Sequence, residues 1–592
     1  MKKITILFSF LLSMILIAGC MKEKREMITL DLGGTWKFKI DSSATGEQKK
    51  WHLSETDHSK WDTVKVPENW DSYGIETYDG VAWFWREFTL PETKEKLAVV
   101  FDAVDDDAVV FINETKVGNH EGWGRKFYFD ITSAVKPGVN TIAVRVNDIE
   151  GPGGINKPVT IRSFENDADL MKGPFADSLA PKPPDWARNA VIYEIFVRDF
   201  SKEGTFNGVE DGLPRLKELG ADILWLMPIH EIGEIKRKGK FGSPYSVKDY
   251  YSINKDFGTA DDLKSLVAAA HKLEMKVIID IVVNHTSWDS KLLKEHPEWF
   301  SKDLNGKILP PVADWWDVAD LNYDLPEVQN YMKTMLSWWV TEFDLDGFRC
   351  DVAEMVPNSF WSAAIGEVQK TKPTFWLAEG STPDLHMAGF HATYSWNIYD
   401  KLEPILTGKD SAGVVYKMLS NEKLEYPKQS LRLRFSENHD KYPQQTVFGE
   451  RESQIATFLT WMLPGIPMIY NGMEVANEKR LDLFEKTDIN WGNEPSTHSW
   501  TVFYKNLKAV RKEFPFLEEV PVVRIASGDQ QVLCFSRKNP WTDQKVVAVM
   551  NFTKELKTIP FKSAETGKLN GLLGDGKTLT LPPYGFDYFV TE

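Results

Sequence analysis

The segment Leu345-Asp346-Gly347-Phe348-Arg349-Cys350-Asp351-Val352 is the clearest clue to how this chain folds. It predicts a short buried strand that ends in charge. Arg349 and Asp351 are two residues apart, so their side chains point to the same side of that strand. A guanidinium beside Asp351 keeps the carboxylate ionised and oriented. The pattern indicates either a structural ion pair or an oriented nucleophile at a strand end.

Apolar strands alternate with amphipathic helices on both sides of this segment, which predicts parallel βα units. Eight such units make a (β/α)8 TIM barrel over residues 187–515, and in this fold the carboxyl ends of the strands carry the chemistry. The predicted strands lie at 191–196, 223–227, 277–283, 347–351, 374–379, 392–395, 431–435 and 466–470. The predicted helices lie at 209–219, 261–273, 326–342, 357–370, 452–463 and 498–513.

A long excursion, about 286–325, follows the third predicted strand as an inserted B-domain loop. Loops of this length inside a compact domain are more often functional than filler.

Two β-rich segments flank the predicted barrel. Residues 30–165 carry short alternating apolar runs separated by Gly, Pro, Asn and Asp, which predicts an N-terminal β-sandwich. Residues 166–186 contain four prolines and form a candidate linker. Residues 516–592 return to alternating apolar runs and predict a C-terminal antiparallel β-domain. The expected architecture is therefore multidomain.

Composition narrows the possible partners. The chain has 592 residues and a formal net charge of −16, which argues against nucleic acid and anionic membrane surfaces and suits a neutral substrate. The 22 Trp and 18 Tyr residues suit a large core and also flat faces for sugar rings. Only three cysteines are present, so no disulfide framework is expected.

Residues 1–20 are predicted to be a targeting segment rather than part of the fold. Lys2 and Lys3 precede an apolar run over 4–17 that is too short for a membrane span. Ile17-Ala18-Gly19-Cys20 then resembles a bacterial lipobox, which implies cleavage before Cys20 and lipidation of its thiol. A plain secretory signal with an incidental Cys is the alternative. With residues 21–29 as a tether, we expect an extracytoplasmic, membrane-anchored lipoprotein.

Polar residues follow three further predicted strands where each ends. The third ends in Asp280-Ile281-Val282-Val283-Asn284-His285, the fifth in Trp376-Leu377-Ala378-Glu379-Gly380 and the seventh in Phe435-Ser436-Glu437-Asn438-His439-Asp440. Together with Asp351, this places three acids at the carboxyl ends of strands of one barrel. Burying several acids together is costly without a task. Glycoside hydrolysis is such a task, because it uses a carboxylate nucleophile and a carboxylic acid proton donor.

These motifs, in this order and spacing, resemble those of glycoside hydrolase family 13, the alpha-amylase family. Each motif alone is weak, whereas seven in order are highly specific. The resemblance spans about 187–592. The further matching stretches are Gly242-Ser243-Pro244-Tyr245-Ser246-Val247-Lys248-Asp249-Tyr250, Asp320-Leu321-Asn322 and Gly465-Ile466-Pro467-Met468-Ile469-Tyr470-Asn471-Gly472-Met473-Glu474.

The resemblance implies a role for each of the three acids. Asp351 resembles the nucleophile, which forms a β-linked glycosyl-enzyme. Glu379 resembles the acid/base, which protonates the leaving oxygen and later deprotonates water. Asp440 resembles the third acid, which binds sugar hydroxyls as the ring flattens toward an oxocarbenium ion. Retention of configuration follows, with the reacting carboxyl groups about 5–5.5 Å apart.

The resemblance also implies four substrate-binding residues. His285 and His439 resemble hydrogen-bond donors to hydroxyls of the sugar at subsite −1. Arg349 resembles the residue that orients the nucleophile, and Tyr245 resembles the aromatic platform under the same sugar. Each has a structural alternative, because a lone His at a strand end is usually a satisfied structural one.

The sequence departs from the family pattern after Asp351. Glu354-Met355 stand where many alpha-amylases have a Lys-His pair, whose Lys serves the +2 subsite and whose His gives a carbonyl oxygen to calcium. Asn284 and Asp320 match two calcium-ligand positions, but calcium takes six to eight oxygens and the sequence does not supply that number. We therefore expect no required cofactor, with calcium binding left open.

Residues 30–165 resemble the jelly-roll sugar-binding domain of family 2 glycoside hydrolases, a galactose-binding-like sandwich. Among the matching stretches are Gly34-Thr35-Trp36 and Val66-Pro67-Glu68-Asn69-Trp70. The resemblance implies carbohydrate binding, and a purely structural sandwich is the alternative. The aromatic residues that are either stacking platforms or core are Trp70, Tyr78, Trp83 and Trp123.

Three functions are consistent with the sequence. The first is a retaining alpha-glycosidase that hydrolyses α-glucosidic bonds in starch-type glucans or maltooligosaccharides. The second is a transglycosylase on the same substrates, in which a sugar acceptor replaces water. The third is a non-catalytic glycan-binding lipoprotein, which the presence of all three acids disfavours. Linkage specificity and chain-end versus internal attack stay open.

Overall fold

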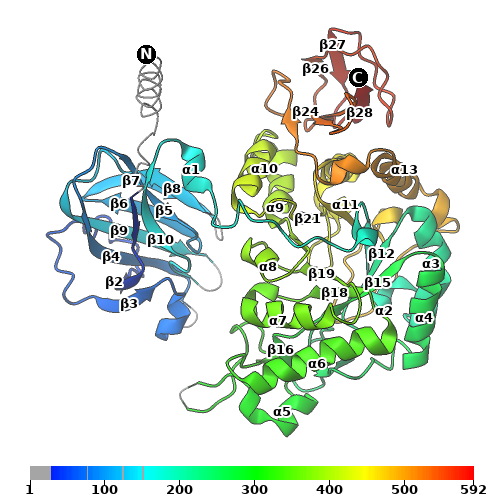
Figure 1. Cartoon of the computed structure of the whole chain (residues 1–592), viewed down its shortest axis with the longest axis horizontal. Coiled ribbons are helices and arrows are strands. Elements are labelled where there is room, and N and C mark those ends of the chain that lie inside the picture. The colour runs from blue at the N-terminus through cyan, green and yellow to red at the C-terminus, as the bar shows by residue number, and fades with distance from the viewer. Residues whose placement is uncertain (1–27, 76–77, 123–125, 150–152, 304, 592) are drawn as a thin grey trace, which may run out of the picture. The chain divides into compact units, whose positions relative to one another are not determined.

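The chain divides into two compact units, Met1–Lys172 and Gly173–Glu592. Figure 1 shows the computed structural model, which describes residues 28–75, 78–122, 126–149, 153–303 and 305–591. The lipobox with Cys20 lies outside these described residues. The division falls within the candidate linker 166–186, which also carries the short helix α1 (Asp167–Met171). Within the described ranges, no helix has the length and the apolar composition needed to cross a membrane.

The N-terminal unit is a β-sandwich of two antiparallel sheets, as the alternating apolar runs predicted. One sheet has the strand order β1-β10-β5-β8 and the other β3-β2-β4-β9-β6-β7. Trp36 and Phe84 from the larger sheet and Val99 from the smaller one belong to the core that joins them. The strands are β1 (Thr29–Asp31), β2 (Gly34–Ile40), β3 (Asp62–Val66), β4 (Gly80–Leu90), β5 (Lys96–Phe101), β6 (Asp107–Ile112), β7 (Thr115–His120), β8 (Phe127–Asp130), β9 (Gly138–Asp148) and β10 (Val159–Phe164).

Two of the four candidate stacking aromatics in this unit are core residues. Trp70 and Trp83 are both fully buried, so neither offers a face to a sugar. Tyr78 is half-buried and donates a hydrogen bond from Oη to Val81 O at 2.9 Å. Trp123 lies outside the described residues. The sequence left these alternatives open because an aromatic residue in a strand looks the same whether its face is covered or not.

The second unit contains a closed barrel of eight parallel strands, which confirms the predicted TIM barrel. All residues of the barrel strands β18 and β19 are buried, as expected for parallel strands covered on both faces. Gly347 starts β18, and a Cβ there would lie 1.9 Å from Phe375 O, so only glycine allows the two strands to pair at this point. The barrel strands are β11 (Ile192–Ile195), β12 (Ile223–Leu226), β15 (Lys276–Ile281), β18 (Gly347–Cys350), β19 (Phe375–Ala378), β20 (Ala392–Tyr394), β21 (Leu431–Arg434) and β22 (Ile466–Tyr470).

Helices lie outside the barrel strands, and the six predicted ones are found within a few residues of their expected bounds. They are α3 (Phe206–Leu219), α4 (Ala260–Lys272), α6 (Pro326–Phe343), α7 (Asn358–Val368), α12 (Glu450–Met462) and α13 (Ser499–Glu513). Further helices are α2 (Val197–Phe200), α5 (Lys291–Glu295), α8 (Asp384–Met387), α9 (Trp396–Leu406), α10 (Val414–Glu425) and α11 (Gln444–Phe448).

The excursion after the third barrel strand is partly ordered by backbone pairing. It contains α5 and an antiparallel ribbon of β16 (His285–Ser287) with β17 (Val318–Asp320). A second ribbon pairs β13 (Glu231–Ile232) with β14 (Val247–Asp249), and Tyr245 lies in the connection between these two strands. Ser246 Oγ donates to Asp317 O at 3.3 Å and connects the two ribbons. The two connected ribbons therefore hold Tyr245 and His285 near the same end of the barrel.

The C-terminal segment forms antiparallel sheets that pack on the barrel helices. Its four-stranded sheet has the order β23-β24-β25-β28, beside a two-stranded sheet of β26 with β27. The rings of Phe458 on α12 and Phe586 on β28 lie 4.8 Å apart. Buried Arg537 donates to Met462 O at 2.6 Å and to Leu517 O at 2.7 Å. The strands are β23 (Val523–Arg524), β24 (Val532–Lys538), β25 (Lys545–Asn551), β26 (Lys557–Pro560), β27 (Thr578–Leu581) and β28 (Phe586–Thr591).

Candidate active site

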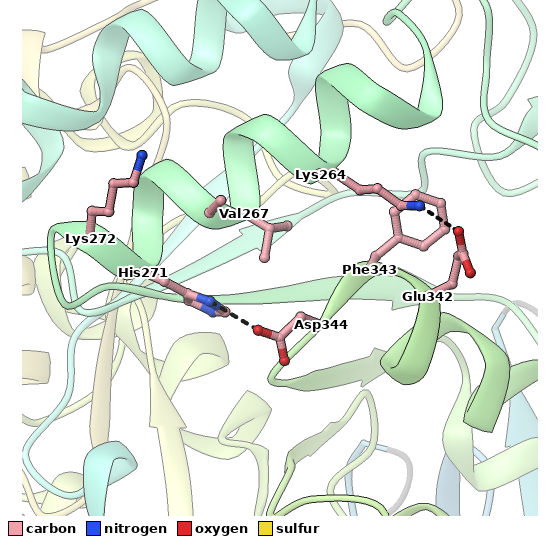
Figure 2. A pocket seen from close by; sticks show the side chains of 8 residues that line it. Lys264, Val267, His271, Lys272, Glu342, Phe343 and Asp344 are labelled. Carbon is pink, nitrogen blue, oxygen red and sulfur yellow. Dashed lines mark hydrogen bonds and ion pairs between the residues drawn. The ribbon is translucent and has the colours of Figure 1, made fainter.

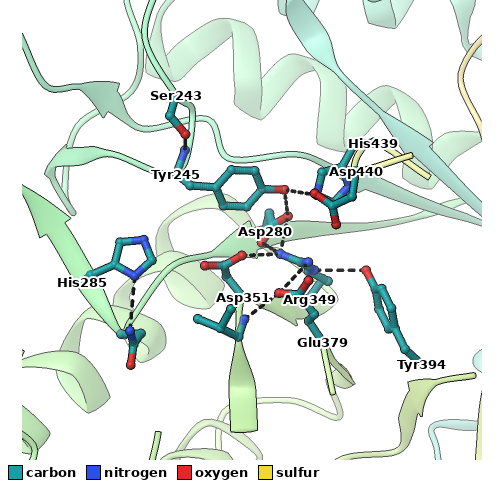
Figure 3. A network of polar contacts seen from close by, with 12 residues as sticks. Ser243, Tyr245, Asp280, His285, Arg349, Asp351, Glu379, Tyr394, His439 and Asp440 are labelled. Atoms are coloured by element: carbon teal, nitrogen blue, oxygen red, sulfur yellow. Dashed lines mark hydrogen bonds and ion pairs between the residues drawn. The ribbon is translucent and has the colours of Figure 1, made fainter. Parts of the chain in front are cut away.

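A single guanidinium joins three carboxylates at the carboxyl ends of three adjacent strands (Figure 3). Arg349 Nη1 donates to Asp280 Oδ1 and to Asp351 Oδ1, both at 2.9 Å. Its Nη2 lies 3.0 Å from Glu379 Oε2. The strand register explains the cluster, because Asp280 on β15 is paired with Arg349 on β18. The predicted contact between Arg349 and Asp351 is therefore present, with two further acids on the same cation.

Burial shifts the pKa values of two acids in this cluster. It raises the pKa of Asp351 well above its usual range, Glu379 raises it further, and Arg349 opposes both effects. Burial likewise raises the pKa of Asp280 against the attraction of Arg349. Burial and Glu379 therefore outweigh the guanidinium at Asp351, in contrast to the expectation from the sequence that Arg349 keeps this carboxylate ionised.

Exposure separates the acids that can touch a ligand from the one that cannot. The side chains of Asp351, Glu379 and Asp440 are 9%, 18% and 38% exposed, whereas those of Asp280 and Arg349 are 0% exposed. The three acids singled out in the sequence therefore open toward solvent at one end of the barrel. Asp280 is buried beneath these acids and contacts the guanidinium of Arg349.

Tyr245 and His439 connect the third acid to this cluster. Tyr245 Oη donates to Asp280 Oδ2 at 3.2 Å and contacts His439 Nε2 at 2.7 Å. The two rings are stacked, with centroids 5.5 Å apart. His439 Nε2 also lies 3.4 Å from Asp440 Oδ1. A continuous polar network therefore runs from Asp440 to the buried guanidinium, as Figure 3 shows.

His439 is held between two acids. Its Nδ1 lies 2.5 Å from Glu194 Oε1 on β11, on the side opposite to Asp440. Although burial lowers the pKa of His439, Asp440 and Glu194 raise it to about 9. The ring is therefore protonated at neutral pH and donates from both nitrogens.

His285 is neutral, in contrast to His439. Burial lowers its pKa to about 4, against a hydrogen bond to the backbone of Tyr245. Its Nδ1 lies 3.3 Å from Asn284 Nδ2, and its ring meets Trp315 edge to face at 5.6 Å. The structure thus brings His285 next to the segment that carries Tyr245, beside the acid cluster.

The two calcium candidates, Asn284 and Asp320, both lie beside His285. The Asn284 side chain contacts His285, and Asp320 lies opposite His285 in the β16–β17 ribbon. In the described part of the chain, the group of three acids or histidines close enough to share a metal is Asp105, Asp106 and Asp148 of the N-terminal unit, so Asp320 has no such partners. Calcium takes six to eight oxygens, which these residues do not supply. Calcium binding stays an open prediction.

Three buried residues of the site were not singled out as functional in the sequence. Asp280 stood inside a quoted motif, and its position just before the strand end was the signal that could have marked it. Glu194 is an acid within an apolar run, which is also typical of a structural ion pair. Tyr394 accepts from Arg349 Nε at 3.3 Å and carried no sequence signal, because tyrosines are common in strands.

A surface pocket elsewhere on the barrel is distinct from this site (Figure 2). It lies between the C-terminal ends of α4 and α6, which precede the amino ends of β15 and β18. Ion pairs cross it, with Lys264 Nζ 2.5 Å from Glu342 Oε1 and His271 Nδ1 3.4 Å from Asp344 Oδ2. In a TIM barrel this face contributes stability rather than chemistry.

A parallel eight-stranded barrel with acids and a buried arginine at its carboxyl end is the architecture of a barrel-type glycoside hydrolase. A crystal structure of an alpha-amylase from Lactobacillus plantarum is 32% identical in sequence, with a TM-score of 0.63, and the match covers 69% of this chain and 100% of that one. The chain belongs to the alpha-amylase family of glycoside hydrolases. The family model described as alpha amylase, catalytic domain, matches residues 175–316 and 313–395. The model for the glycosyl hydrolases family 2 sugar binding domain matches residues 29–156.

Further relatives agree with this membership. The crystal structure of a noncanonic maltogenic alpha-amylase, AmyB, from Thermotoga neapolitana is 30% identical, with a TM-score of 0.60, over 68% of this chain and 96% of that one. Alpha-amylase MalA of Haloarcula japonica is 26% identical over 421 residues, which is 66% of this chain. The chain spans 60% of the length of that relative.

Replacing Glu194 by Gln is expected to lower the pKa of His439, because one of the two acids that keep the ring protonated becomes neutral. If activity needs His439 in its protonated form, activity is present below the pKa of His439 and is lost as the pH rises through that pKa. The alkaline limb of the pH profile of kcat/KM should therefore move down by about one pH unit. Profiles measured from pH 5 to 10 (about the usable range) test this.

Glu518→Gln is the matched control for this variant. Glu518 is also a buried acid, its carboxyl accepts from Asn189 N at 2.6 Å, and it is not among the groups that shift the pKa of His439. The control should leave the alkaline limb in place. An identical limb in the wild type and in Glu194→Gln would contradict the role of Glu194.

Proposed function

We propose that the protein is a retaining alpha-glycosidase that hydrolyses α-glucosidic bonds in starch-type glucans or maltooligosaccharides. The observation that carries this proposal is the single guanidinium of Arg349, which contacts both Asp351 and Glu379. Two carboxylates on one guanidinium lie close together, which favours the separation of about 5–5.5 Å in retaining enzymes over about 6.5–9.5 Å in inverting ones.

The first step of the proposed mechanism forms a covalent intermediate. Glu379 gives its proton to the glycosidic oxygen while an oxygen of Asp351 bonds to C1, and the C1–O bond to the leaving sugar breaks. Arg349 fixes the attacking carboxylate through its 2.9 Å contact. The product is a β-linked glycosyl-enzyme on Asp351 and a released sugar with a free hydroxyl.

The second step returns the enzyme to its starting state. Glu379, now ionised, takes a proton from water, whose oxygen attacks C1 as the bond to Asp351 breaks. Two inversions leave the product in the α configuration. Both transition states carry positive charge on the sugar ring, which the surrounding acids, including Asp440, stabilise.

The names of the relatives support an α-glucan substrate. They include a cyclomaltodextrinase from Geobacillus thermopakistaniensis, 26% identical over 69% of this chain, and an intracellular maltogenic amylase from Bacillus subtilis, 26% identical over 60%. An alpha-amylase structure from Geobacillus thermoleovorans, 25% identical, is complexed with acarbose. His439 and His285 would donate to hydroxyls of such a neutral sugar, with Tyr245 beneath the ring.

Asp351→Asn should lower kcat on maltooligosaccharides by at least about a thousandfold, because the amide does not form the glycosyl-enzyme. Reducing-sugar release from starch, maltooligosaccharides, pullulan and cyclodextrins measures activity, and proton NMR of the first products reports the anomer. The wild type should release the α-anomer.

A first-formed β-anomer would exclude the retaining mechanism. A folded wild-type protein that releases no sugar from any of these substrates would contradict the hydrolase proposal. Longer oligosaccharides formed from shorter ones would instead indicate transglycosylation.

The protein would also be a lipoprotein outside the cytoplasm, anchored to a membrane through Cys20. The support is the sequence Ile17-Ala18-Gly19-Cys20 behind an apolar run. Cells fed labelled palmitate should incorporate label into the wild type and into Cys534→Ser, but not into Cys20→Ser. Label that persists in Cys20→Ser would contradict this anchor.

A further inference from the structure

The loops that follow β18 and β19 stay paired beyond the ends of the two strands. Glu379 N donates to Cys350 O at 3.0 Å, and Ala353 N donates to Glu379 O at 3.0 Å. The backbone of Glu379 is therefore attached on both sides to the loop that carries Asp351.

Val352 directs another N–H of this loop at the side chain of Glu379. Its backbone is left-handed, with φ 38° and ψ 47°, a conformation that β-branched residues rarely adopt. In this conformation Val352 N donates to Glu379 Oε2 at 2.7 Å, and Arg349 Nη2 lies 3.0 Å from the same oxygen. Backbone of this kind persists only where its surroundings hold it. One hydrogen bond and one ion pair thus orient the Glu379 carboxyl group.

Glu354 attaches the second loop to the first on the far side of Glu379. Its Oε1 accepts hydrogen bonds from the backbone N–H groups of Ser381 and of Thr382, the latter at 3.0 Å. A Cβ on Gly380 would lie 2.7 Å from Glu354 Cγ and 2.9 Å from its Oε1, so glycine allows this approach. Only a side chain with an acceptor oxygen can bind both N–H groups.

We propose that Glu354 is a positioning residue for Glu379. The proposal rests on the proposed function, in which Glu379 is the acid/base. Glu354 holds the turn 380–382, and with it the Glu379 carboxyl, at hydrogen-bond distance from the glycosidic oxygen that Glu379 protonates. General acid catalysis depends on this distance, and a misplacement of about 1 Å costs about a hundredfold in rate.

The positioning role of Glu354 can be tested with two substrates whose leaving groups differ in their need for a proton. A maltooligosaccharide needs protonation of its leaving oxygen, whereas fluoride leaves α-maltosyl fluoride without it. Since kcat/KM reports the steps up to the glycosyl-enzyme, Glu354→Ala should lower it about ten- to a hundredfold on the oligosaccharide and less than about threefold on the fluoride. Glu354→Gln keeps an acceptor oxygen and should stay within about threefold of the wild type on both substrates.

Two further variants complete the experiment. Glu367→Ala removes an exposed acid of α7 that is paired with Lys370. This variant should leave kcat/KM unchanged on both the oligosaccharide and the fluoride. Glu354→Leu also has no acceptor, should behave like Glu354→Ala and serves if the alanine variant does not fold.

An equal loss on both substrates in Glu354→Ala would show general damage to the site and overturn the positioning role, as would no loss on either. A wild-type protein inactive on both substrates would overturn the proposed function itself. The two failures are therefore distinguishable.

Discussion

The buried guanidinium of Arg349 is the constraint on which the catalytic end of the barrel depends. A cation without solvent contact needs anionic partners, and Asp280, Asp351 and Glu379 supply them from three adjacent strands. Breaking a buried pair of this kind by removing one partner costs about 3–5 kcal/mol, because the other charge is left uncompensated. The same contacts orient the two carboxyl groups proposed to react. Stability and chemistry therefore rest on one set of ion pairs.

The network around this guanidinium has an excess of acids. Asp440 and Glu194 flank His439, and three more carboxyl groups surround Arg349. A site with this balance repels anions and stabilises positive charge on a sugar ring, in agreement with the net charge of −16. The attachment of Glu354 and Val352 to the loop of Glu379 holds in place the acid that is proposed to move a proton. Preorganisation of this kind avoids rearrangement during the reaction.

Prediction from sequence succeeded for features that repeat locally. The barrel strands were found because parallel strands buried on both faces read as short continuous apolar runs. The positions of Asp351 and Glu379 were found because each directly follows such a run, and that of Asp440 because it closes the polar segment after β21. Trp70 and Trp83 show the limit, since their residue type fits a sugar platform and a core position equally well. Only the packing of the sandwich shows that both are covered.

The amino-acid sequence by itself determined the barrel, the β-rich units on either side of it and the three acids at its mouth, because periodicity and strand-end motifs are local properties of the chain. The tertiary structure alone decided which basic side chain each acidic side chain contacts. Closure of the barrel brings Glu194 of β11 to His439 after β21, across 245 residues. The pairing of β15 with β18 sets Asp280 against Arg349. Such contacts depend on strand register and barrel closure, which no short stretch of sequence encodes.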